Sequence, residues 1–369
     1  MRFSLCRAAA LLVLLLAGCG GGGGGTELPP PAPKETIKVT QERLATPVQG
    51  ASNYLLYLPQ GYGDDASRKW PLIVFLHGSQ PFSNLTLEGL SQQGVMGHMK
   101  EVGKGLPAIV VQTQQDVNTL GHKVEWHDPV FVDAVIREIE GRYAVDKTRV
   151  SITGGSLGGF GSWSMVLAFP NRFAAVMPVV GGLSNDSDSF DRRLPITSAA
   201  DWGASFGRIT TTPMRVYAGI PDSYVPIAWA RNPVEILRAA GGSPDMRETQ
   251  KSHGETQYEA FSAEPIGWML AQSRPDASAE PTPMLADDYL GTYRAGNLTV
   301  AVSSPGDRIT LTFSSNRAPI SFFPMGDDRF MGGWMMRAKR DAQGRVKCLV
   351  TPMYLLPDLT RDGASEACN

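Results

Sequence analysis

Eight short strand-like segments, all but the last of them apolar, alternate with helical patterns between residues 36 and 251, and this order constrains the fold more than any other feature of the chain. The central segments, such as "PLIVFLHG" and "RVSITG", are almost continuously hydrophobic, as strands buried on both faces of a parallel sheet are. Alternation of strands with crossover helices indicates an α/β fold with a doubly wound, mostly parallel eight-stranded sheet. The expected strands lie at residues 36–40, 53–58, 71–78, 107–113, 149–154, 174–180, 213–219 and 245–251.

The clearest helix is predicted at residues 129–143. Asp128 can cap its N-terminus and Pro129 suits the first helical position. Phe131, Val135 and Ile139 recur every four residues and form one apolar stripe. This helix would lead directly into the strand at residues 149–154.

Composition divides the chain into five parts. Two arginines and an apolar run too short to span the ~30 Å of a bilayer mark a signal segment, and a Gly- and Pro-rich tether follows it. After a polar, proline-containing break, short alternating runs separated by turn residues predict a small antiparallel β domain. The expected parts are a signal peptide at 1–18, a tether at 19–35, the α/β domain at 36–272, a linker at 273–284 and the β domain at 285–369.

The four cysteines have different expected fates. Cys6 lies within the signal segment, and Cys19 follows Leu16-Ala17-Gly18. Cys348 and Cys368 lie close together in sequence, which predicts a disulfide in an exported protein and leaves two free thiols as the alternative. No CxxC pair or His/Cys cluster indicates a metal site. The formal charge of -2 gives no basic excess, so no nucleic-acid partner is expected.

The segment ending at Cys19 resembles the lipobox of bacterial lipoproteins, in which a signal peptidase cuts before a cysteine that is then lipidated. The resemblance implies a lipid anchor at Cys19, which would hold the protein to a membrane of the bacterial cell envelope, on the periplasmic or surface face. An ordinary secretory signal is the alternative.

Residues 154–158 have the pattern G-x-S-x-G, directly after a predicted strand and before a helical stretch. In a strand-to-helix elbow the serine, here Ser156, occupies a strained backbone position with its hydroxyl exposed, and the flanking glycines allow the turn and close helix packing. The start of the helix would direct the N–H of Leu157 toward developing negative charge. Ser156 is therefore the candidate nucleophile.

A serine hydroxyl needs a base to take its proton, and in this architecture the chain order is serine, acid, histidine. His253 is the one histidine downstream of Ser156, so it is the candidate base. Asp222 lies in a Gly/Pro-containing loop after the strand at 213–219, where sheet enzymes hold catalytic groups. It is the candidate acid; Asp201 and Asp245 are its rivals.

An oxyanion needs a second N–H donor, which the loop after residue 78 would supply, most simply from Ser79 and otherwise from Gln80. His77 is expected to shape that loop rather than to react. Trp126 and His127, just before the helix at 129–143, are candidate lining residues of a substrate cleft, and packing is the alternative for Trp126.

Taken in order, these segments resemble the α/β-hydrolase superfamily over about residues 37–272. The segments are "PLIVFLHGS", "RYAVDKTRVSITGGSLGGFGSW", "FPNRFAAVMPVVGG", "YAGIPDSYVPI" and "SHGETQYEAF". They look most like the exported feruloyl-esterase, acetyl-esterase and polyhydroxyalkanoate-depolymerase branch. The resemblance implies an α/β-hydrolase fold and a Ser156–His253–Asp222 triad. Leu157, where relatives often have methionine or glutamine, and Ala218-Gly219, where many have His-Gly, depart from the pattern.

The function implied is hydrolysis of carboxylic esters through an acyl-enzyme, without a metal or organic cofactor. The substrate would be a small-molecule or polysaccharide-linked ester. A peptidase or amidase with the same triad is one alternative, and a non-catalytic, glycan-binding surface lipoprotein is another. No feature of the sequence indicates an oligomeric state.

Overall fold

The computed structural model describes residues 34–48, 51–78, 86–115, 127–183, 199–276, 287–351, 356–364 and 368, with the backbone alone at 51, 52 and 199–201. The expected signal peptide, Cys19 with nearly all of the tether, and most of the linker lie outside the described residues. Within the described ranges, none of the helices combines the length and the apolar character needed to cross a membrane.

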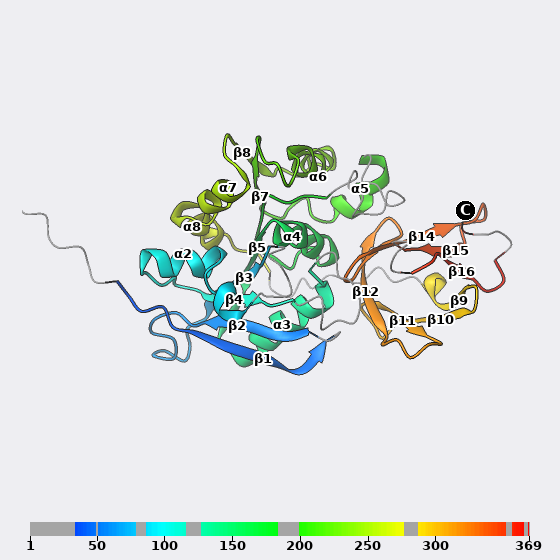
Figure 1. Cartoon of the computed structure of the whole chain (residues 1–369), viewed down its shortest axis with the longest axis horizontal. Helices are drawn as coiled ribbons and strands as arrows, with labels where there is room; N and C mark the ends of the chain where they lie inside the picture. The colour runs from blue at the N-terminus through cyan, green and yellow to red at the C-terminus, as the bar shows by residue number, and fades with distance from the viewer. Residues whose placement is uncertain are drawn as a thin grey trace, which may run out of the picture. The chain divides into compact units, whose positions relative to one another are not determined.

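The α/β part is built on one eight-stranded sheet with the order β1-β2-β4-β3-β5-β6-β7-β8 (Figure 1). β2 runs antiparallel to both of its neighbours, and the strands from β4 and β3 to β8 are parallel. All eight expected strands are present, and the α/β-hydrolase fold class is confirmed. Their bounds are β1 (Val39–Val48), β2 (Ala51–Tyr57), β3 (Trp70–Leu76), β4 (Ile109–Thr113), β5 (Val145–Gly155), β6 (Ala175–Val179), β7 (Arg215–Gly219) and β8 (Asp245–Thr249).

Helices cover both faces of this sheet, because side chains alternate between its faces along each strand. In β3, Leu72 and Val74 join a core with α3, α4 and α6, whereas Ile73 and Phe75 join a second core with α2, α7 and α8. The predicted helix is α3, and Asp128 accepts a hydrogen bond from the N–H of Val130 at 2.9 Å, as expected of its cap. The bounds are α1 (Leu87–Leu90), α2 (Gly94–Val102), α3 (Pro129–Arg142), α4 (Leu157–Ala168), α5 (Ala199–Gly207), α6 (Ile227–Ala239), α7 (His253–Ala260) and α8 (Ala263–Ala271).

The C-terminal part is a closed antiparallel barrel, entered through the short 3-10 helix η2 (Asp287–Tyr289). The antiparallel domain was predicted, but its closure into a barrel was not. The strands β13 and β16 are three residues long, which is too short to show an alternating pattern in the sequence. Closure comes from pairing of β16 with β9. The strands are β9 (Gly291–Ala295), β10 (Leu298–Ser303), β11 (Ile309–Phe313), β12 (Ile320–Gly326), β13 (Arg329–Met331), β14 (Met335–Arg340), β15 (Val346–Val350) and β16 (Leu359–Arg361).

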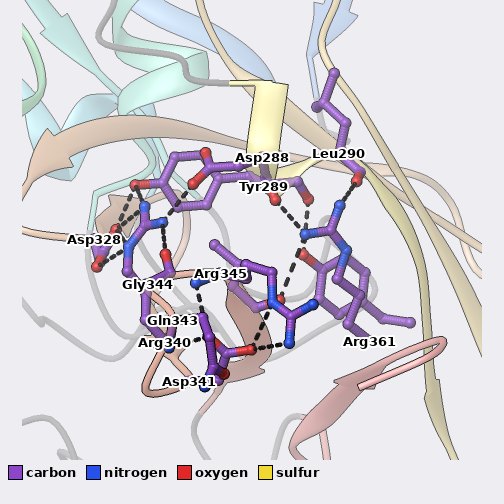
Figure 2. Close-up of polar contacts among 12 residues, drawn as sticks. Asp288, Tyr289, Leu290, Asp328, Arg340, Asp341, Gln343, Gly344, Arg345 and Arg361 are labelled. Atoms are coloured by element: carbon purple, nitrogen blue, oxygen red, sulfur yellow. Dashed lines mark hydrogen bonds and ion pairs between the residues drawn. The ribbon is translucent and has the colours of Figure 1, made fainter. Parts of the chain in front are cut away.

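Two arginines tie the entrance of the barrel to its later strands (Figure 2). Arg340, at the end of β14, contacts the carboxylates of Asp288 and Asp328, the latter at 2.8 Å. Arg361, at the end of β16, donates to the carbonyl oxygens of Asp288 and Leu290 at 2.6 and 2.7 Å. Charge-assisted hydrogen bonds of this kind are about twice as strong as neutral ones, so they fix η2 against the closing strands.

Strand β12 contributes side chains to two hydrophobic cores, that of the barrel and that of the α/β part. Phe322 packs inside the barrel, whereas its neighbour Phe323 belongs to the core of the α/β part, where its ring lies 4.5 Å from that of Phe169. Asp327 accepts hydrogen bonds from both the N–H and the hydroxyl of Ser205 at 2.7 Å. The β domain was expected to be separate, but it shares packing with the α/β part. Cys348 and Cys368 form the expected disulfide.

Candidate active site

Ser156 occupies a strained turn between β5 and α4. Its backbone has φ 56° and ψ -117°, a conformation that residues with a Cβ rarely adopt. Its N–H donates to the carbonyl oxygen of Val179 at 2.9 Å, and its side chain is half-buried. The predicted elbow is therefore present, with α4 beginning at Leu157. An N–H in the first turn of a helix has no partner within that helix, which is what an oxyanion donor at Leu157 requires.

Two glycines of the elbow lie against the backbone of β3. A Cβ on Gly158 would stand 1.9 Å from the carbonyl oxygen of Leu76, and one on Gly154 would stand 2.6 Å from the same oxygen. Backbone atoms cannot move aside as a flexible side chain can. The glycines are therefore required by close packing of α4 on β3, which fixes where Ser156 stands.

We expect Gly158→Ala to lower the free energy of unfolding by about 3 kcal/mol, since overpacking against backbone is costly. Gly141→Ala is the matched control. Gly141 lies in α3 with no atom within 4 Å of an added Cβ. The control should be stabilised by about 0.5 kcal/mol, because alanine favours helix over glycine. Urea unfolding of both variants tests this, and equal stabilities would contradict the packing argument.

Asp222 and His253 are joined directly. His253 Nδ1 donates to Asp222 Oδ2 at 2.6 Å, while Asp222 Oδ1 accepts from the N–H groups of Tyr224 and Val225 at 2.9 and 3.0 Å. The Asp222 side chain is 1% exposed and that of His253 is 15% exposed. With its proton held on Nδ1, a neutral His253 presents Nε2 as the acceptor, the state that a general base needs.

The rival acid Asp245 lies at the amino end of β8, where Arg215 and Arg247 pair with it. The side chain of Asp201 is outside the described atoms. Ser156, Asp222 and His253, in contrast, all follow the carboxyl ends of strands in one half of the sheet, β5, β7 and β8. Ligand sites of open α/β sheets lie at this edge.

Gln257 links the base to the elbow. It lies one helical turn after His253 on α7, and its Nε2 donates to the His253 carbonyl oxygen at 3.4 Å. Its Oε1 stands 2.1 Å from where a Cβ of Gly155 would be, so its side chain rests on the residue before Ser156. A Cβ at Gly155 would therefore push the Gln257 side chain out of its present position.

A buried histidine pair fixes the end of β3, next to the elbow. The N–H of Gln115 donates to His77 Nε2 at 3.1 Å, which leaves the proton on Nδ1 to bond the carbonyl oxygen of Gly78 at 2.7 Å. His127 Nε2 then donates to the carbonyl oxygen of His77 at 2.8 Å. A Cβ on Gly78 would be 3.6 Å from that of Ser156, so this backbone reaches the nucleophile.

His77 therefore shapes the loop, as predicted. The interpretation of His127 as a cleft-lining residue is wrong, because its side chain is fully buried and bonded to the backbone of His77. Ser79, Gln80 and Trp126 lie outside the described residues, so their expected roles stay predictions.

Lowering the pH should destabilise the fold through the buried pair of His77 and His127. Burial, and next the neighbouring His77, lower the pKa of His127 to about 3. Below its ordinary pKa of about 6.5, the unfolded chain takes up a proton that the folded chain refuses, so stability falls as the pH drops toward 3. We expect His127→Gln, which keeps a donor for the His77 carbonyl, to lose about 2 kcal/mol less than the wild type between pH 6.0 and 4.5. Urea unfolding at both pH values measures this; equal losses would contradict it.

Comparison with known proteins gives a family match for the part of the chain that contains Ser156. Residues 48–209 match the Esterase family model, described as "Putative esterase". The matched region contains the whole elbow with Ser156, whereas Asp222 and His253 follow it in the chain.

One curated relative is named "Probable feruloyl esterase C", from Aspergillus terreus. It is 29% identical over 140 residues, which are 37% of this chain, and the chain spans about half (48%) of its length. Among solved structures, a "ferulic acid esterase" is similar at 18% identity and TM-score 0.49, over 64% of this chain and 99% of that one. A "Thermostable Esterase" is similar at 24% identity and TM-score 0.45, over 64% and 63%.

The structure adds two residues that sequence reasoning missed. Tyr224, 77% exposed, places its ring 5.3 Å from that of His253, and Gln257 joins α7 to the elbow that holds Ser156. The one signal in the sequence was their position relative to the predicted acid and base. Tyr224 follows Asp222 by two residues, and Gln257 follows His253 by four. Neither residue belongs to a pattern of its own.

Proposed function

We propose that this protein is a serine esterase that hydrolyses carboxylic esters through an acyl-enzyme. The observation that carries the proposal is the 2.6 Å hydrogen bond from His253 Nδ1 to a buried Asp222 carboxylate, at the same edge of the sheet as the strained Ser156. A histidine oriented by a buried carboxylate can serve as the base that activates a serine hydroxyl. The match of residues 48–209 to the Esterase family model supports it.

In the proposed reaction, His253 Nε2 takes the hydroxyl proton as Ser156 Oγ forms a bond to the ester carbonyl carbon. The resulting oxyanion is held by the Leu157 N–H and by a donor from the loop after Gly78, which we propose to be Ser79. The imidazolium then protonates the leaving alcohol as the carbon–oxygen bond breaks. A water molecule, deprotonated by His253, attacks the acyl-enzyme and releases the acid and Ser156.

Asp222 keeps its charge throughout and stabilises the transient imidazolium. Two backbone N–H groups hold its other oxygen, so the carboxylate is fixed before substrate arrives. Such preorganisation costs nothing at the moment of reaction. The resemblance of residues 16–19 to a lipobox extends the proposal to a bacterial envelope lipoprotein, anchored at Cys19.

Purified protein tests the proposal when it is assayed on aryl and alkyl esters beside the corresponding anilides. We expect turnover of esters with little turnover of amides, and labelling of Ser156 by a fluorophosphonate probe. Faster amide cleavage would favour a peptidase with the same triad. Absence of both turnover and labelling would contradict an enzyme and favour a glycan-binding protein.

A further inference from the structure

Different strands hold the proposed nucleophile and the proposed base. Ser156 follows β5, whereas the imidazole of His253 is bonded to Asp222 in the loop after β7, and β6 lies between these two strands. The bond to Asp222 orients the imidazole but does not tie it to the elbow. Proton transfer needs base and hydroxyl within about 3 Å of each other, so a contact between α7 and the elbow bears directly on the chemistry.

Gln257 supplies such a contact. A Cβ on Gly155, the residue before Ser156, would stand 2.1 Å from Oε1 and 2.9 Å from Cδ of Gln257, so the amide lies directly over Gly155. Nε2 of the same amide donates to the carbonyl oxygen of His253 at 3.4 Å. That hydrogen bond is longer than most, and the packing of the amide on Gly155 is therefore the stronger part of the link.

Other contacts fix α7 to elements that do not carry Ser156. The buried hydroxyl of Thr256 shares a hydrogen bond of 2.7 Å with the hydroxyl of Thr249 at the end of β8. The hydroxyl of Tyr258 donates to Glu101 of α2 at 2.7 Å. These bonds hold the helix to β8 and α2, and Gln257 adds the contact on the side of the nucleophile.

We propose that Gln257 is a positioning residue for the base: by resting on Gly155, it sets the place of His253 relative to Ser156. The proposal rests on the proposed function and adds to it the residue that brings base and nucleophile into register. In this role Gln257 exchanges no proton and acts only through His253. Its loss should slow proton transfer without weakening substrate binding, so kcat should fall while KM stays the same.

Two substitutions at this position separate contact from hydrogen bonding. Gln257→Ala removes both, and we expect it to lower kcat by about tenfold, less than the ~hundredfold that a displacement of 1 Å can cost. Gln257→Met keeps the length of the side chain and its helix propensity, and it can still rest on Gly155. It should keep kcat within about twofold of the wild type, because methionine adapts its shape to the space available.

Gly155→Ala removes the same contact from the other side. Gly155 lies in β5 without a positive φ, and the three atoms nearest to an added Cβ all belong to the flexible Gln257 side chain. The displaced amide has room, because Gln257 lines a cavity of about 520 Å³ between α2 and α7. The variant should therefore fold and lower kcat by about tenfold. Adding Gln257→Ala should cost nothing more, since both changes break one link.

Gln272→Ala is the matched control. Gln272 stands at the end of α8, and its Nε2 donates to the carbonyl oxygen of Trp268, four residues earlier, at 3.1 Å. Its side chain is half-buried, as is that of Gln257. The control loses the same kind of local hydrogen bond far from any catalytic candidate, so its kcat should stay within about twofold of the wild type.

Steady-state kinetics on one aryl ester give kcat and KM for every variant, and urea unfolding confirms that each is folded. Unchanged kcat in Gln257→Ala would overturn the proposal, and so would a rise in KM alone, which would assign Gln257 to substrate binding. Losses that multiply in the double variant, or a Gln257→Met variant as slow as Gln257→Ala, would also overturn it. Wild-type protein without ester turnover would contradict the proposed function itself, so the two failures are distinguishable.

Discussion

Replacing Ser156 with alanine should abolish turnover, with kcat falling by about a millionfold, as when a nucleophile is removed from a working triad. Without Oγ no acyl-enzyme forms, and only the oxyanion donors and substrate binding continue to lower the barrier. Alanine keeps a Cβ in the strained φ 56° conformation, so the elbow itself should persist. Steady-state hydrolysis of an aryl ester measures the effect.

Ser164→Ala is the control for this change. Ser164 lies in α4, and its hydroxyl donates to the carbonyl oxygen of Phe160 within the same helix. Its replacement therefore removes a serine hydroxyl without changing the elbow. Its kcat should stay within about twofold of the wild type. Substantial residual activity in Ser156→Ala, at unchanged melting temperature, would assign the nucleophile to another residue.

Replacing Asp222 with asparagine should lower kcat by about ten-thousandfold. The amide is nearly isosteric, but it carries no charge to stabilise the imidazolium. The side-chain oxygen bonded to the N–H groups of Tyr224 and Val225 would remain an acceptor, which turns the amide NH₂ toward His253 Nδ1. His253 would then carry its proton on Nε2 and could not accept one from Ser156.

Asp245→Asn tests the rival acid at the same time. Asp245 pairs with Arg215 and Arg247 at the far end of β8, so its loss should change stability slightly and kcat less than about twofold. The kcat of the two variants on one ester is compared at a fixed pH. The assignment of Asp222 fails if the Asp245 variant is the more impaired.

The α/β fold was predictable because its signals are local. Buried strands such as β3 read as continuous apolar runs, and α3 carries both a cap and a stripe within its own residues. Closure of the barrel was not predictable, because it depends on the three-residue strand β16, in which Thr360 and Arg361 pair with β9 across almost seventy positions. Pairings of that span leave no periodic trace in the sequence.

The candidate site likewise has residues that could be predicted from the sequence and residues that could not. Ser156, Asp222 and His253 could be named because each stands at a predictable place after a strand, and chain order assigns their roles. His127 could not be placed, because sequence does not say whether a polar side chain before a helix faces solvent or turns inward to the carbonyl of His77. The cavity of about 520 Å³ between α2 and α7 could not be foreseen either, because its lining residues Phe75, Gly94 and Gly254 come from three separate elements.

The pairing of β9 with β16 also has a consequence for how the chain is made. β9 is the first strand of the barrel and β16 the last, so the barrel cannot close until Leu359–Arg361 have been synthesised. The sheet ends at Thr249, more than a hundred residues earlier. A chain that stops before Leu359 would carry a complete sheet and a barrel with two unpaired edges, on β9 and β15, and such edges are templates for aggregation.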